Sequence, residues 1–226
     1  MDNSKSMTFE RAQLGKGVYS RSDISWILEI PRSRAGYLLR EYTSKRFREL
    51  SNFNYDFGDK NVKLVNFQGL IELKIFHIWR TQGVPVKNIM NAHQYLSNKY
   101  KTKYPLALNN LAIAGKDVIE DLKGKGYLKA DGSNQSYLGL IRPFIRKIEY
   151  DDGFAIKLYP LGRKGQIVVD PSCQSGQPII EGTRIAVSNI ACQHNAGDSI
   201  KLLSKLYQLP RNKIKAAIDY YNSAAA

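Results

Sequence analysis

Cysteine and long hydrophobic runs are both scarce in this sequence. Its 226 residues include two cysteines, Cys173 and Cys192, which are too few for a disulfide scaffold and favour a reducing compartment. No apolar run approaches the ~20 residues that a membrane-spanning helix needs, and no charged-then-apolar leader follows Met1. We therefore expect a cytoplasmic protein without a membrane segment, and we treat residues 224–226, three alanines, as a cloning scar.

Motifs that carry enzyme chemistry are also missing. The sequence has no Gly-x-Ser-x-Gly, no His-Glu-x-x-His and no acidic cluster of the kind that holds Mg²⁺. Cys173, Cys192 and His194 would together supply three metal ligands, one fewer than a structural zinc site requires. The tripeptide 182–184, Gly-Thr-Arg, lacks the spacing of a phosphate-binding loop and is typical of a turn. We therefore predict no catalytic residues, no metal site and no cofactor.

Acidic residues are fewer than basic residues, and the difference is larger in the N-terminal part of the chain than in the C-terminal part. The chain carries 34 lysines and arginines against 20 acids, a formal charge of +14. Residues 1–165 hold 28 of these basic residues and 16 of the acids, whereas residues 166–226 hold 6 and 4. A concentrated positive field favours a polyanionic partner through phosphate neutralisation and counterion release. A basic protein without such a partner is the alternative that charge alone leaves open.

Two short helices separated by a proline are predicted within residues 19–42. Ser22 is a candidate N-cap for the first helix. Pro31 ends that helix because proline lacks an N–H and restricts the residue before it to extended geometry. The second helix starts near Arg32, and its spacing predicts that Ala35, Leu38 and Leu39 are buried. A tight break followed by a basic helix is typical of a helix-turn-helix, whose second helix enters the major groove of DNA.

The segment 32–48 concentrates basic side chains on and just after this second helix, with Glu41 as its one acid. A solvated basic face would explain some of them, but the charge together with the helix pair favours DNA. The residues that we expect to contact DNA are Arg32, Ser33, Arg34, Tyr37, Arg40, Lys45, Arg46 and Arg48.

The remaining sequence predicts a mainly α-helical protein with small β elements, an α+β fold. Apolar spacing indicates a central helix over 68–82, a second from about 85 to 100 and a third over 135–148. Asp151-Asp152-Gly153 predicts the turn of a β-hairpin. We divide the chain at a glycine-flanked basic tetrapeptide, residues 162–165: residues 1–163 form a helix-turn-helix or winged-helix-like DNA-binding and dimerisation domain. Residues 164–223 then form short strands followed by a three-helix, homeodomain-like domain, with Asp198 capping its second helix and Pro210 opening its third.

The C-terminal part resembles the domain of unknown function numbered 433. The motifs that carry this resemblance occur in order: Asp170-Pro171, Gly176 to Ile180, Gly182-Thr183-Arg184-Ile185, Gly197-Asp198-Ser199 and Ala217-Ile218-Asp219-Tyr220. The stretch 66–96 is similar to a segment of long VapB-type antitoxins that carry this terminal domain and a MerR-like helix-turn-helix, although Tyr42 stands where MerR proteins have tryptophan.

This resemblance implies an antitoxin of a type II toxin–antitoxin system that neutralises a PIN-like ribonuclease and represses its own operon. We expect a homodimer or a larger toxin–antitoxin assembly, because helix-turn-helix proteins gain specificity from paired half-sites. The candidate residues for binding the partner are Arg184, Lys201, Lys205, Arg211 and Lys215. A stand-alone helix-turn-helix regulator without a toxin partner is the alternative function.

Overall fold

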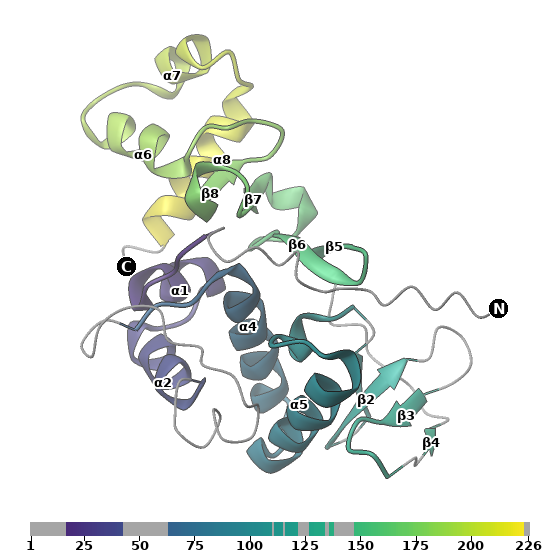
Figure 1. The fold of residues 1–226 in the computed structure, drawn as a ribbon. Coiled ribbons are helices and arrows are strands. Elements are labelled where there is room, and N and C mark those ends of the chain that lie inside the picture. The colour runs from purple at the N-terminus through teal and green to yellow at the C-terminus, as the bar shows by residue number, and fades with distance from the viewer. Residues whose placement is uncertain are drawn as a thin grey trace, which may run out of the picture.

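The computed structural model describes residues 17–42, 63–109, 111–114, 116–121, 127–133, 136–137 and 147–223. The described helices are α1 (Arg21–Leu28), α2 (Arg32–Tyr42), α4 (Phe67–Thr81), α5 (Val86–Tyr100), α6 (Val187–Asn195), α7 (Ile200–Leu206) and α8 (Arg211–Ser223). Short 3-10 turns lie at η2 (Pro105–Ala107), η3 (Arg163–Gly165) and η4 (Gln174–Gly176). Helices and two small antiparallel sheets together confirm the predicted α+β fold (Figure 1).

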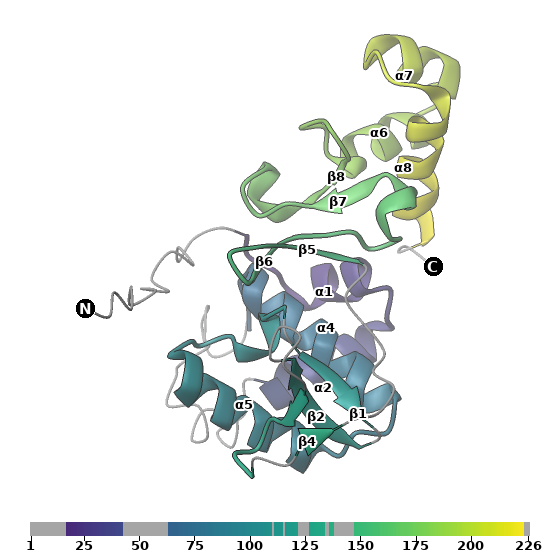
Figure 2. The ribbon, with the colours of Figure 1, turned by 90° about the vertical axis from the view of Figure 1, so that its right-hand side faces the viewer.

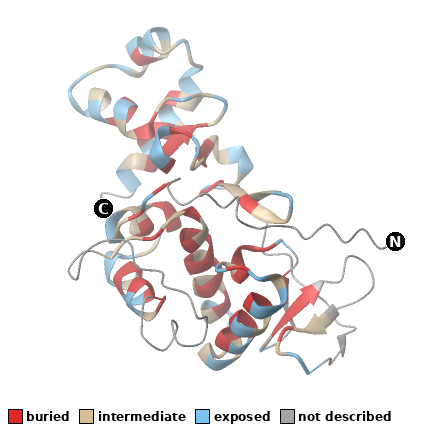
Figure 3. Cartoon of the chain, in the orientation of Figure 1, coloured by how far each residue is buried: buried red, intermediate tan, exposed pale blue. Residues whose placement is uncertain are grey.

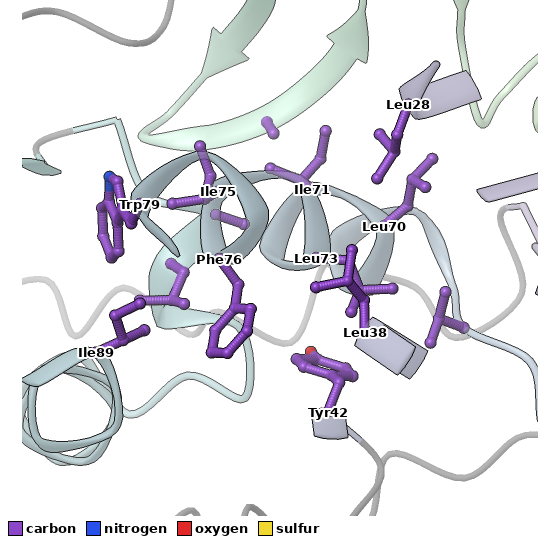
Figure 4. Packing of buried hydrophobic residues seen from close by; sticks show 14 of the residues in the cluster. Leu28, Leu38, Tyr42, Leu70, Ile71, Leu73, Ile75, Phe76, Trp79 and Ile89 are labelled. Atoms are coloured by element: carbon purple, nitrogen blue, oxygen red, sulfur yellow. The ribbon is translucent and has the colours of Figure 1, made fainter. Parts of the chain in front are cut away.

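Helix α4 lies at the centre of the N-terminal half. Asn66 caps it, because its Oδ1 accepts a hydrogen bond from the Gly69 N–H at 2.9 Å. The helix is apolar around most of its circumference and is therefore covered by α2, α5, η2 and strand β6 (Phe154–Leu158). Figure 4 shows Leu38 and Tyr42 from α2 and Ile89 from α5 directed toward this helix. The helices predicted over 68–82 and from 85 to 100 are confirmed.

One carboxylate is fully buried inside this helical core. Glu72, on α4, accepts a hydrogen bond from the Tyr42 hydroxyl, and its Oε1 accepts one from the Leu106 N–H at 2.8 Å. The Nε2 atom of His93 lies 3.4 Å from Glu72 Oε2. A buried charge is tolerated only when such partners surround it, so Glu72 ties α2, α5 and η2 to α4.

The first sheet consists of β1 (Leu111–Ala114), β2 (Asp117–Asp121), β3 (Tyr127–Lys129) and β4 (Ser136–Tyr137), in that order and all antiparallel. The helix predicted over 135–148 is wrong at both ends, because residues 136–137 form β4 and Ile148 begins β5; residues 138–146 lie outside the described residues. Short apolar runs do not distinguish a helix from a strand, and here the pairing with β3 decides.

The second sheet has the order β5 (Ile148–Asp151), β6, β7 (Ile167–Val169) and β8 (Pro178–Ile180). The predicted hairpin is confirmed: Asp152 and Gly153 both have positive φ, 46° and 83°, which a tight two-residue turn between antiparallel strands requires. Strand β6 pairs with β7 through Leu158 and Val169, so the sheet continues past residues 162–165. The strands on either side of the change in charge therefore belong to one sheet.

Three helices follow this sheet, as the sequence predicts. Helices α6 and α7 pack against α8 around buried residues such as Ile190, Leu203 and Ile214. The N-cap of α7 is Ser199 rather than Asp198, because the Ser199 Oγ accepts the Leu202 N–H at 3.2 Å. Helix α8 begins directly after Pro210, which supplies the fixed φ of a helix start.

The two halves of the chain meet through aromatic side chains near α1. The Tyr19 hydroxyl donates a hydrogen bond to the Gly176 carbonyl at 3.1 Å. Gly176 has a φ of +82°, and a Cβ there would lie 2.1 Å from the Tyr19 oxygen, so only glycine fits. Trp26 stacks on Tyr220 of α8, with ring centroids 5.5 Å apart. Figure 2 shows α1 beneath the C-terminal strands and helices. The contacts of Tyr19 and Trp26 hold α1 against this part of the chain.

Candidate nucleic-acid interface

The two helices predicted to form the helix-turn-helix are present, with bounds close to those expected. Ser20, not Ser22, is the N-cap of α1: it forms a capping box in which the Ser20 N–H donates to Asp23 Oδ2 at 2.8 Å. The helix ends at Glu29, whose φ of 55° is left-handed. Pro31 then leads directly into α2, and its carbonyl accepts the Ala35 N–H at 2.9 Å. The turn between the helices is therefore three residues long.

A close approach between the first turn of α1 and the first half of α2 fixes their relative orientation. The Arg21 Nε donates to the Arg32 carbonyl at 2.8 Å, and an Arg32 guanidinium nitrogen donates to Ser22 Oγ at 2.6 Å. A Cβ at Gly36 would lie 2.8 Å from Arg21 Nε, so the Arg21 side chain uses the space that this glycine leaves open. Sequence spacing gave no indication of the roles of Arg21 and Gly36, because a glycine inside a helix usually signals only lower helix propensity.

Helix α2 has one buried face and one exposed face. The buried residues Ala35, Leu38, Leu39 and Tyr42 pack into the helical core, as the apolar spacing predicted for the first three. Arg32, Ser33, Tyr37 and Arg40 are exposed, and their spacing places them along one side of the helix. This exposed side offers arginine and hydroxyl donors, and Tyr37 among them is 37% exposed. Such donors suit phosphate oxygens and guanine edges.

Arg34 differs from the other predicted contacts. Its side chain is half-buried, its Nε is 3.5 Å from His77 Nδ1 on α4, and its guanidinium lies 5.1 Å from the centre of the Tyr37 ring. The pKa of His77 is lowered, first by burial and then by the positive charges of Arg34 and Lys74. A neutral His77 can accept from Arg34, so Arg34 is held at the edge of the exposed side of α2 and orients Tyr37.

The other predicted site residues lie elsewhere. Lys45, Arg46 and Arg48 fall in the segment 43–62, outside the described residues. The predicted partner-binding residues are all exposed: Arg184 in the turn after β8, Lys201 and Lys205 on α7, and Arg211 and Lys215 on α8. Figure 1 places α7 far from α2, so Lys201 and Lys205 lie on a different surface from the exposed side of α2. Arg184 lies beside η4, where the Gln174 side chain donates to its carbonyl at 3.0 Å.

Metal-ligating side chains do not gather within the described ranges: no group of three or more histidine, cysteine or acidic residues there could hold a metal ion. Cys173 is buried, Cys192 is exposed, and His194 Nδ1 lies 2.8 Å from the Asp198 carbonyl oxygen. None of the helices that the structure describes is long and apolar enough to cross a membrane.

Two comparisons with known protein sequences bear on the function of this chain. Residues 167–221, which span β7 to α8, match the family model described as "Protein of unknown function (DUF433)". A Mycobacterium tuberculosis (strain ATCC 25618 / H37Rv) protein named "Putative antitoxin VapB45" is 21% identical over 167 residues, which cover 68% of this chain and 70% of that protein. Together these matches support an antitoxin-like protein.

The fold also has a solved counterpart. The crystal structure of Rv2018 from Mycobacterium tuberculosis superimposes with a TM-score of 0.61 at 16% sequence identity, covering 89% of this chain and 97% of that one. At this identity the likeness establishes a shared fold. Because the match covers most of both chains, the arrangement of N-terminal helices, sheets and C-terminal helices recurs as a whole.

Proposed function

We propose that this protein is the antitoxin of a type II toxin–antitoxin module, which binds DNA at its own operator and neutralises a PIN-like ribonuclease. The observation that carries the DNA-binding part is the exposed side of α2, formed by Arg32, Ser33, Tyr37 and Arg40 and preceded by a three-residue turn. A rigid α1–α2 pair of this kind presents the second helix to a major groove, in the manner of MerR-like proteins. Lys45, Arg46 and Arg48 would add contacts to phosphates.

The antitoxin part is supported by the match to DUF433 and by the name of the VapB45 relative. In this proposal the protein acts in the cytoplasm without catalysis, as a homodimer or within a larger assembly with the toxin. A dimer places two copies of α2 on paired half-sites. The exposed residues that would contact the toxin are Arg184, Lys201, Lys205, Arg211 and Lys215.

The DNA-binding part is tested by measuring the affinity of the full chain for its own promoter fragment by fluorescence anisotropy. Arg40→Ala removes a donor from the exposed side of α2, and we expect a loss of about 1–3 kcal/mol if the guanidinium contacts a guanine edge. Lys87→Ala is the matched control, because Lys87 is an exposed cation on α5 and its loss should leave sequence-specific binding nearly unchanged. Equal affinity of Arg40→Ala and wild-type protein would show that α2 is not the recognition helix.

The antitoxin part is tested by co-expression with the product of the adjacent open reading frame, followed by co-purification and a growth assay. Neutralisation of a toxic product supports the proposal. If operator binding persists while the adjacent product neither harms growth nor co-purifies, the protein is instead a stand-alone regulator.

A further inference from the structure

Helix α7 exposes two large apolar side chains on one side. Leu202 is 50% exposed and Leu206 is 62% exposed, and they stand four residues apart, so they lie next to each other on the helix surface. Leu203 is fully buried and holds α7 onto the three-helix core, so the exposure of the other two leucines does not come from loose packing. Figure 3 shows α7 mostly in pale blue at the far end of the molecule.

Basic residues outnumber acids in the sequence around these two leucines, and Asp198 and Asp219 are the nearest acids on either side. Residues 199–218 contain five basic residues and no acid. The Lys213 Nζ donates a hydrogen bond to the Glu181 carbonyl at 3.0 Å. The exposed basic side chains here include Lys201 and Lys205 on α7 and Arg211 at the start of α8. The α7 surface is defined as Lys201, Leu202, Lys205, Leu206 and Arg211: it combines an apolar centre, Leu202 and Leu206, with exposed basic side chains close to it in sequence, which we call its positive rim. An apolar centre with polar side chains around it is the usual anatomy of a protein–protein interface.

We infer that the α7 surface docks a partner protein whose contact surface is acidic and contains an apolar pocket for Leu202 and Leu206. Charge complementarity selects this occupant, since the positive rim favours an acidic partner and speeds its association. A second copy of this chain would bring a like-charged rim against the same cations. Nucleic acid would satisfy the cations but would leave two leucines against phosphates or solvent, because its recognition relies on hydrogen-bond donors and stacking side chains.

This inference rests on the proposed function in one respect: it takes the toxin to be the acidic partner and gives the chemistry of the contact. The position of α7 is compatible with that role. Because α7 lies far from α2, a partner on the α7 surface leaves the exposed side of α2 open (Figure 1). The full chain can then hold the partner and the operator at the same time.

The test measures binding of the full chain to the purified product of the adjacent reading frame, with operator affinity measured in parallel. A double variant, Leu202→Ser with Leu206→Ser, removes the apolar centre, and we expect it to weaken partner binding by about tenfold or more while operator affinity is unchanged. The matched control is Leu161→Ser, because Leu161 is 40% exposed in the loop after β6, away from α7. The control should bind the partner like the wild type. Unchanged melting temperatures establish that both variants are folded.

Charge is tested separately with Lys201→Glu combined with Lys205→Glu, against Lys87→Glu on α5 as the control. We expect the double reversal to slow association with the partner about tenfold at low salt, and the difference to shrink as salt is added.

Three outcomes would overturn the inference. If the wild type binds the adjacent product and both double variants bind it equally well, the α7 assignment is wrong while the proposed function stands. If the leucine double variant instead dissociates a dimer of this chain, or loses operator binding, the occupant is a second copy or DNA. If the wild type binds no adjacent product, the toxin part of the proposed function fails and the inference fails with it.

Discussion

Removing the buried carboxylate of Glu72 should destabilise the protein strongly. The change Glu72→Leu keeps a side chain of similar size on α4 but removes the acceptor for the Tyr42 hydroxyl and the Leu106 N–H. It also removes the negative charge beside His93. A buried donor that loses its acceptor costs about 1–3 kcal/mol, and two donors lose an acceptor here. The relief of no longer burying a charge offsets part of this, so we expect a net loss of about 3–5 kcal/mol.

The change Glu72→Gln should cost much less, about 1–2 kcal/mol, because the amide keeps one oxygen to accept the Leu106 N–H and can donate to the Tyr42 oxygen. Urea unfolding followed by tryptophan fluorescence measures both variants. Glu149→Gln is the matched control: its carboxylate is also hydrogen-bonded, to Tyr159 and Lys157, but it is solvent-accessible, and its loss should cost less than about 1 kcal/mol.

Glu72→Leu should also affect the candidate DNA-binding site, because Tyr42 is the last residue of α2. Loss of its partner on α4 should loosen that end of the helix. Operator binding by the folded fraction of Glu72→Leu should then be weaker than that of Glu72→Gln. If Glu72→Leu unfolds within about 0.5 kcal/mol of the wild type, the three contacts do not hold the helices together and the reasoning is refuted.

Two further predictions concern the neighbourhood of α1. Burial and the charge of Lys147 lower the pKa of Lys74 to about 8, and the charge of Glu29 opposes this shift in part. Between pH 8 and 10.5 the unfolded chain therefore binds more protons than the folded chain, and the free energy of unfolding rises with pH. Lys74→Met should remove a rise of at most about 2 kcal/mol between pH 7.5 and 9.5, measured from urea midpoints; an identical pH dependence in both proteins would contradict it. Trp26→Ala should cost about 2–4 kcal/mol because it deletes the stack on Tyr220. Calorimetry should then show the C-terminal helices melting before the rest, whereas one unchanged transition would argue against a role for this contact.

Apolar periodicity was sufficient to predict most of the helices. Helix α4 is apolar over most of its surface and α5 has one apolar face, so spacing alone located both within one or two residues. Helix caps were harder to assign. Ser20 and Ser22 both suit an N-cap, as do Asp198 and Ser199, and the choice depends on which oxygen reaches the N–H of the first turn.

Contacts between residues far apart in the chain account for what spacing did not predict. Glu72 looks like a single acid in an apolar helix until Leu106 and Tyr42 are brought to it by the fold. Arg34 belongs to the basic segment by sequence, but its side chain is partly buried against His77, which lies 43 residues further along the chain. The exposed side of α2 was predictable because a helix alone determines which residues share a face.

Residues 162–165 lie between the two parts of the chain to which we assign different functions, but these two parts pack against each other. Charge falls sharply there, and the DUF433 match begins at residue 167. The packing nevertheless crosses this point through the Leu158–Val169 strand pairing, the Tyr19–Gly176 hydrogen bond and the Trp26–Tyr220 stack.

A fragment ending at residue 165 would expose Trp26 and Tyr19 and would leave the edge of β6 unpaired. An unpaired apolar edge invites aggregation, and loss of the aromatic contacts removes the support on one side of α1. Helix α1 in turn fixes α2 through Arg21 and Gly36. Weak operator binding by such a fragment would therefore reflect a displaced helix pair as much as a missing contact. Point substitutions on the exposed sides of α2 and α7, which leave these interfaces intact, separate the two proposed activities where truncation would not.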